Sequence, residues 1–197
     1  MFFCGVDPGA SGGIAVIDRA GQFVAAHRWD SKAPARLYQL LLTIRGEIYN
    51  NCIYLERIQA HPGEGVGHVV NNMATVENYG IWQGFILAAG LLPVLVHPKV
   101  WQKAYGLTAW QARQKIDPSA PGPLQLARRL WPGAPLPCLA DDGKAVALLL
   151  ADLARRDSIK GIDRAALNLA NEVKAKAARK KARAARRAAK SYPAPQF

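Results

Sequence analysis

Short apolar runs separated by glycine- and aspartate-rich turns open the chain and predict β-strands. Residues 2–6, 12–18 and 22–28 are such runs, and the turn residues between them are too few for anything but hairpins. They predict three consecutive strands. Two later apolar runs, 52–55 and 93–97, predict a fourth and a fifth strand.

Helices are predicted in the intervals between these strands. Leucines and isoleucines recur at helical spacing over residues 33–49, which predicts an amphipathic helix, and a second helix is predicted over 69–89. Residues 59–68 contain three glycines and one proline and predict a loop. Pro98 predicts the first turn of a short helix. A further helix is predicted over 141–156, with acids in its first turn, as the helix dipole favours.

This order of elements predicts an α/β fold in which a mixed five-stranded sheet carries helices on both faces. We expect residues 1–160 to form one domain and residues 161–197 to form a C-terminal extension. The extension is expected to continue as helix over 161–173. Residues 174–190 are almost entirely Ala, Lys and Arg, and we expect them to be at least partly disordered without a polyanion, because like charges repel.

The charge of the chain narrows its possible partners. The 197 residues carry a formal net charge of +12 and the pI is about 10.0, so the expected partner is an anionic polymer or an acidic membrane surface. No apolar run is long enough to cross a bilayer, and no signal peptide is evident. Three scattered cysteines are too few for a disulfide framework or a zinc site. We therefore expect a soluble protein of a reducing compartment.

The few acids are conspicuous where they follow predicted strands or begin a predicted helix. Asp7 ends the first strand beside a glycine-rich turn, where a carboxylate can hold a divalent metal and glycines leave room for a phosphate. Glu56 ends the fourth strand, and if these strands are neighbours, the two like charges are tolerable only with a cation between them. Asp141 and Asp142 start a helix and could bring a carboxylate to that pair. The purely structural alternatives are an Asx turn at Asp7 and a helix N-cap at Asp141 or Asp142.

These motifs, GVDPG at 5–9, YLE at 54–56 and DDGKAVALLLA at 141–151, together resemble the RuvC-type Holliday-junction resolvases of bacteria and phages. The resemblance covers about residues 1–156, and the motifs come in the family's order. It implies a ribonuclease H-like fold, a homodimer, and cleavage of two symmetric strands of branched DNA. It also implies two Mg²⁺ or Mn²⁺ ions in each active site. A protein of the bacterial cytoplasm or nucleoid, encoded by a bacterium or a phage, is the location that the resemblance implies.

Residue by residue, the resemblance assigns the catalytic and metal-binding roles to Asp7, Glu56 and either Asp141 or Asp142. Val146 departs from it, because the family carries Asp or Glu there, and two metal ions need several carboxylates to hold them. Three alternatives are open: either Asp141 or Asp142 supplies the missing ligand, or the protein binds junctions and cuts them poorly, or Val146 is an introduced inactivating change. A sugar kinase of the same superfamily would need a second phosphate loop and an adenosine pocket. The chain shows neither, so we expect no nucleotide cofactor.

DNA contacts are expected from the glycine-rich turn, from the loop after Glu56, from lysines near the site and from the basic extension. The loop after Glu56 is similar to the family segment that inserts near the junction centre. The candidates are Gly9, Ser11, His61, Gly63, Gly65, His68, Lys99, Lys144, Lys174, Arg179, Lys180, Lys181, Arg183, Arg186 and Arg187. Trp101 is expected mainly in the core. His97 is a further candidate for positioning water.

Overall fold

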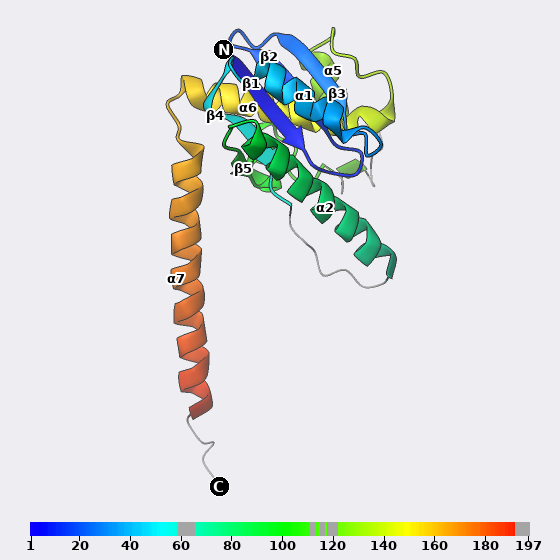
Figure 1. Ribbon diagram of the computed structural model, residues 1–197. Coiled ribbons are helices and arrows are strands. Elements are labelled where there is room, and N and C mark those ends of the chain that lie inside the picture. The colour runs from blue at the N-terminus through cyan, green and yellow to red at the C-terminus, as the bar shows by residue number, and fades with distance from the viewer. Residues whose placement is uncertain (59–65, 111–112, 115–116, 118–121, 192–197) are drawn as a thin grey trace. The chain divides into compact units, whose positions relative to one another are not determined.

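The computed structural model describes all but four internal segments and the last six residues of the chain. The described residues are 1–58, 66–110, 113–114, 117 and 122–191 (Figure 1). They fall into two compact units, Met1–Ile162 and Asp163–Phe197, which are treated separately below.

A mixed sheet forms the centre of the first unit, with strand order β3-β2-β1-β4-β5 (Figure 1). Its strands are β1 (Phe2–Asp7), β2 (Gly13–Asp18), β3 (Phe23–Arg28), β4 (Ile48–Glu56) and β5 (Val94–Val96). The first three strands form an antiparallel meander, and β4 and β5 continue the sheet parallel to β1. The predicted α/β class with a mixed five-stranded sheet is therefore confirmed.

Helices cover both faces of this sheet, with α1 and α2 in front of it and α6 behind it in Figure 1. The helices of this unit are α1 (Pro34–Ile44), α2 (Val66–Ala88), α3 (Pro98–Ala104), α5 (Pro123–Leu130), a short 3-10 turn (Leu139–Asp141) and α6 (Asp142–Ile159). Helix α6 packs against β1, β2 and β4. A Cβ atom on Gly5 would overlap the carbonyl oxygen of Ala147, so glycine at this position allows α6 to lie directly on β1.

Two predicted boundaries in the first unit were wrong. The helix predicted over 33–49 ends at Ile44, because Ile48 pairs with Phe2 and begins β4. Ile48 continues the helical spacing of apolar residues, so its periodicity concealed the strand. Of the predicted loop 59–68, residues 59–65 lie outside the described residues and Val66 already begins α2.

The second unit contains α7 (Arg164–Ser191). The helix begins after Asp163, whose carboxylate accepts a hydrogen bond of 3.0 Å from the N–H of Ala166. Gly161, with a φ of 65°, lies in the break between α6 and α7. Residues 174–190 are helical, whereas we expected partial disorder, because the helix propensity of alanine and of long basic side chains outweighs their repulsion. In the described part of the chain, no helix is both long enough and apolar enough to cross a membrane.

Candidate active site

The parallel pairing of β1 and β4 brings two strand-end carboxylates to one edge of the sheet. Val6 is in register with Leu55, so the next residues along each strand are Asp7 and Glu56. Neighbouring strands are about 4.8 Å apart, and residues at the same register share a face. The condition set by the sequence, that the two strands be neighbours, is met.

Helix α6 adds a third carboxylate, because its first residue, Asp142, lies at the same edge. A Cβ atom on Gly143 would overlap the carbonyl oxygen of Ser11, so the start of α6 is pressed against the turn between β1 and β2. The negative charge of Asp142 raises the pKa values of both Asp7 and Glu56. The three acids therefore interact electrostatically although they come from three separate elements.

Burial and like charge shift these acids toward their protonated forms. Burial raises the pKa of Asp7 to about 6, and Asp142 adds to this although the N–H of Gly9 donates a stabilising hydrogen bond of 2.8 Å. Burial, followed by the charge of Asp7, raises the pKa of Glu56 to about 8. Burial also raises the pKa of Asp142, against a hydrogen bond from the N–H of Leu124. All three acids therefore favour their protonated forms more than free carboxylic acids do.

The neighbouring Asp141 behaves in the opposite way. Its carboxylate accepts a hydrogen bond of 3.0 Å from the N–H of Cys138 and forms an ion pair of 2.8 Å with Lys144. Burial acts to raise its pKa, but these partners outweigh burial and lower the pKa to about 2. Lys144 also donates to the carbonyl oxygen of Pro135. Asp141 and Lys144 therefore hold the start of α6 in place, and their charged groups are engaged with each other.

Val146 lies one helical turn after Asp142 on α6. Its side chain is 6% exposed. Residues four apart share a helix face, so the apolar side chain of Val146 lies on the same face of α6 as the carboxylate of Asp142.

The indole of Trp101 is a part of the site that sequence reasoning missed. Its Nε1–H donates a hydrogen bond of 2.7 Å to Oε1 of Glu56, and its ring is 2% exposed. The expectation that Trp101 packs in the core describes only its ring. The available signal was its position: it follows β5, which is parallel to β4, so α3 starts at the edge where Glu56 lies.

Basic side chains at the end of β3 were also missed. Arg28 pairs with Gly13, which in turn pairs with Asp7, so β3 ends at the same sheet edge as β1. A cavity of about 460 Å³ opens there, lined among others by Arg28, Trp29 and Arg36. The guanidinium of Arg28 donates to the carbonyl oxygen of Ala140, next to the start of α6.

The remaining predicted DNA contacts fall into several groups. Gly9 and Ser11 lie in the turn that follows Asp7, whereas His61, Gly63 and Gly65 lie outside the described residues. His68 belongs to the first turns of α2, and Lys99 to the first turn of α3.

His97 caps α3, because its Nδ1 accepts a hydrogen bond of 3.1 Å from the N–H of Lys99. Burial, Lys99 and Arg57 lower the pKa of His97. The predicted basic contacts from Lys174 onward all lie on α7.

The chemistry of the donor set fits a hard divalent cation. Asp7, Glu56 and Asp142 offer carboxylate oxygens, the ligands that Mg²⁺ and Mn²⁺ prefer, and their mutual repulsion is what a cation relieves. Among the described residues, no three His, Cys, Asp or Glu side chains converge tightly enough to form a ready-made metal-binding group.

Comparisons with known proteins bear on the fold. No protein-family model and no curated protein sequence matches the chain. The structure is similar to that of RuvC from Thermus thermophilus in complex with a Holliday junction substrate, with a TM-score of 0.50, 13% identity, and coverage of 77% of this chain and 90% of that chain. A second structure of Thermus thermophilus RuvC gives a TM-score of 0.51 and 16% identity, covering 79% and 96%. The chain has a RuvC-like, ribonuclease H-like fold, which confirms the expectation from the sequence motifs.

Proposed function

We propose that this chain, which has the fold of RuvC, is a divalent-cation-dependent endonuclease that cuts branched DNA, with four-way (Holliday) junctions as its substrate. The observation that carries the proposal is the meeting of Asp7, Glu56 and Asp142 at one sheet edge, with their pKa values raised by burial and by one another. The net charge of +12 suits a polyanionic substrate. The substrate class is taken from the RuvC structure solved with a Holliday junction.

Each residue of the site has a distinct part in this proposal. Asp7, Glu56 and Asp142 hold the cations, and Trp101 fixes the orientation of the Glu56 carboxylate through its indole N–H. Gly9 lies beside the Asp7 carboxylate and has no side chain, so it leaves room for a backbone phosphate there. Two bound Mg²⁺ or Mn²⁺ ions supply Lewis acidity for phosphodiester hydrolysis. Asp141 and Lys144, which pair with each other, hold the helix start and take no part in the chemistry.

A second candidate is a junction-binding protein that cuts poorly. The pairing of Asp141 with Lys144 and Cys138 favours it, because Asp141 is then not available to replace the carboxylate missing at Val146. Three carboxylates remain for two ions, so the second ion would be held weakly. This candidate shares the fold and the substrate with the first and differs only in the rate of cutting.

We further propose that the protein acts as a homodimer in the cytoplasm, since a four-way junction presents two symmetric strands to be cut. Sedimentation of the protein on junction DNA tests this. A single protomer on each junction would contradict it.

Nicking of a labelled four-way junction and of a linear duplex, in Mg²⁺, Mn²⁺ or chelator, tests the proposed activity. We expect symmetric, cation-dependent cuts in the junction that Asp7→Asn abolishes. The adjacent acids provide a matched pair: Asp142→Asn should abolish cutting, whereas Asp141→Asn should leave it. Equal loss in both variants would contradict the assigned ligands, and equal cutting of the linear duplex would contradict junction selectivity.

Val146→Asp, with Val146→Asn as its uncharged control, separates the two candidates. Cutting that appears only in Val146→Asp identifies a resolvase scaffold limited at one ligand. Cutting by the unaltered chain at a similar rate identifies three carboxylates as sufficient. Absence of both cutting and junction preference in all variants would refute the proposal.

A further inference from the structure

Helix α7 carries a dense positive charge. The last acidic residue of the chain is Glu172, and residues 174–186 contain seven Lys or Arg. The described side chains among them are exposed. A segment of this kind attracts polyanions, but its charge alone does not specify which side of the helix contacts them.

The positions of these charges around the helix are uneven. At about 100° for each residue, Lys176, Arg179, Lys180, Arg183 and Arg186 fall within an arc of about 120°. We call these five residues the basic face. Lys174 and Lys181 lie on the opposite side, among alanines.

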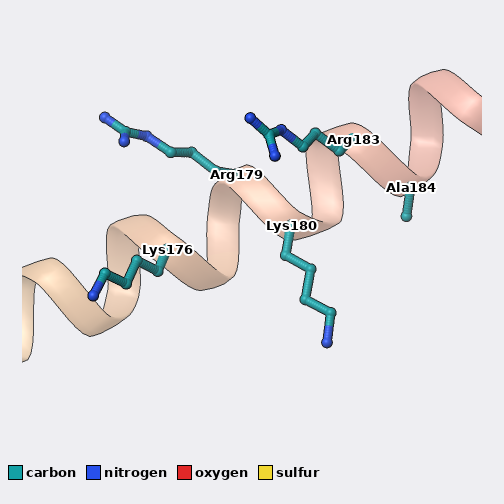
Figure 2. A pocket seen from close by; sticks show the side chains of 5 residues that line it. All are labelled: Lys176, Arg179, Lys180, Arg183 and Ala184. Atoms are coloured by element: carbon teal, nitrogen blue, oxygen red, sulfur yellow. The ribbon is translucent and has the colours of Figure 1, made fainter.

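Figure 2 shows four residues of the basic face on successive turns of α7. Arg179 and Arg183 extend to one side of the helix axis and Lys180 to the other, and together with Lys176 they border a shallow concavity. From Lys176 to Arg186 the face is about 15 Å long, given a rise of about 1.5 Å for each residue. Duplex DNA presents a phosphate about every 1.7 Å of its axis, so several phosphates lie within reach of one such face.

The opposite side of the helix distinguishes DNA from a membrane. A helix that lies on a membrane buries large apolar residues such as Leu, Phe or Trp on the side opposite its basic residues. Between residues 174 and 186 that side of α7 offers only alanines and two lysines. Alanine adds little buried apolar area. This stretch of the helix therefore has the charge to bind an anionic surface but no large apolar side chains to insert into a membrane.

We propose that α7 binds the duplex arms of the DNA through its basic face, independently of base sequence and of junction structure. This rests on the proposed function only for the identity of the polyanion. The arginines pair with phosphates through two parallel hydrogen bonds each, and the lysines act as point charges. The helix supplies affinity, whereas junction selectivity and cutting stay with the first unit.

Two variants of the full-length chain with equal charge test the role of this face. Lys180→Gln with Arg183→Gln removes two charges from the basic face, and Lys174→Gln with Lys181→Gln removes two from the opposite side. Dissociation constants for a linear duplex and a four-way junction are measured in chelator, so that no cutting occurs, at several salt concentrations. Far-UV circular dichroism of each variant verifies that helix content is unchanged.

We expect the basic-face variant to lower the log–log salt slope by about 2, at about 0.9 for each phosphate that the helix no longer neutralises. It should weaken binding to duplex and junction by the same factor. The opposite-side variant should lower the slope by less than half as much. Equal effects of the two variants, a change in the ratio of junction to duplex affinity, or tighter binding of duplex RNA than of duplex DNA would each overturn the proposal. Failure of the nicking assay with the slopes as expected would refute the proposed enzyme and leave the role of α7 standing.

Discussion

Replacing Glu56 by Gln tests whether the sheet edge is a cluster of carboxylates in need of a cation. Gln has the same shape and its side-chain oxygen can still accept the indole N–H of Trp101, so the change removes charge and little else. Without metal, an ionised Glu56 is buried beside Asp7 and Asp142 and destabilises the folded state. In chelator at alkaline pH we therefore expect Glu56→Gln to be more stable than the unaltered chain.

The pKa of Glu56 sets the size and the pH range of this effect. Burial and the neighbouring acids raise it from 4.5 to about 8 in the folded chain. The folded state therefore holds the proton more tightly than the unfolded state, so the free energy of unfolding falls as pH rises from about 4.5 to about 8. At about 1.4 kcal/mol for each pKa unit, the full shift corresponds to about 5 kcal/mol. Because Glu56 keeps part of its surface in solvent, we expect about half of this in the measurement.

Urea unfolding at pH 4.5, 6.5 and 8.5 in chelator measures the difference. The stabilities of the two proteins should be similar at pH 4.5 and should diverge toward pH 8.5. Glu77→Gln, which removes an exposed acid from α2, is the control and should show no such divergence. Added Mg²⁺ or Mn²⁺ should stabilise the unaltered chain more than Glu56→Gln, because a cation that binds only the folded state adds to its stability. A stability of the unaltered chain in chelator that stays level or rises with pH, relative to Glu56→Gln, would refute the electrostatic argument.

Two further predictions concern residues beside the ligands. Trp101→Phe keeps an aromatic ring but removes the indole N–H that donates to Glu56, so Mn²⁺ affinity, measured by titration calorimetry, should fall about tenfold. Because Trp101 is buried and Phe is smaller, the cavity left behind should also lower the thermal midpoint. Unchanged affinity would reduce Trp101 to a packing residue. Asp141→Asn should lower the free energy of unfolding by about 1–2 kcal/mol at neutral pH, because it removes the ion pair with Lys144 and weakens the hydrogen bond from the N–H of Cys138. Because the pKa of Asp141 is lowered to about 2, this deficit should shrink as pH falls toward 2, and Mn²⁺ affinity should stay unchanged. Weakened Mn²⁺ binding would make Asp141 a ligand.

The sequence predicted which strands end in an acid but left open whether those strands are neighbours in the sheet. An apolar run ending in Asp7 and another ending in Glu56 needed to be parallel neighbours for the two acids to meet, and the structure shows that they are. The order of the strands along the chain followed from alternation and turns, which are local signals, whereas their order in the sheet depends on contacts between distant segments. Ile48 could not be placed in this way, because an apolar residue at helical spacing satisfies both a helix and a buried strand until its partner, Phe2, is known.

Contacts between distant elements could not be predicted. The hydrogen bond from Trp101 to Glu56 joins residues 45 apart in the sequence, and the rest of the ring is as buried as any core residue. A tryptophan in an apolar stretch usually packs in the core, so nothing in the sequence indicated that the N–H of Trp101 bonds to an acid. Arg28 reaches Ala140 across an even longer stretch of chain.

Two adjacent aspartates, the proposed ligand Asp142 and the structural residue Asp141, lie in very different environments. Asp141 closes a 3-10 turn, where the N–H of Cys138 and the ammonium group of Lys144 stabilise its charge. Asp142 begins α6 one residue later, turned by about 100° around the helix axis. There it is half-buried near Asp7 and Glu56, and its pKa rises while that of Asp141 falls.

The different environments of Asp141 and Asp142 bear on the role of position 146. The carboxylate that the resemblance to RuvC-type resolvases places at this position has no substitute in Asp141, since moving Asp141 into the site would break its ion pair with Lys144 and its hydrogen bond from the N–H of Cys138. An aspartate at position 146 would add a fourth acid on the face that begins at Asp142. It would destabilise the chain in chelator for the same reason that Glu56 does, and it would strengthen cation binding for the same reason. Opposite effects of Val146→Asp on stability in chelator and in Mn²⁺ would therefore mark position 146 as part of the metal site even if cutting stayed slow.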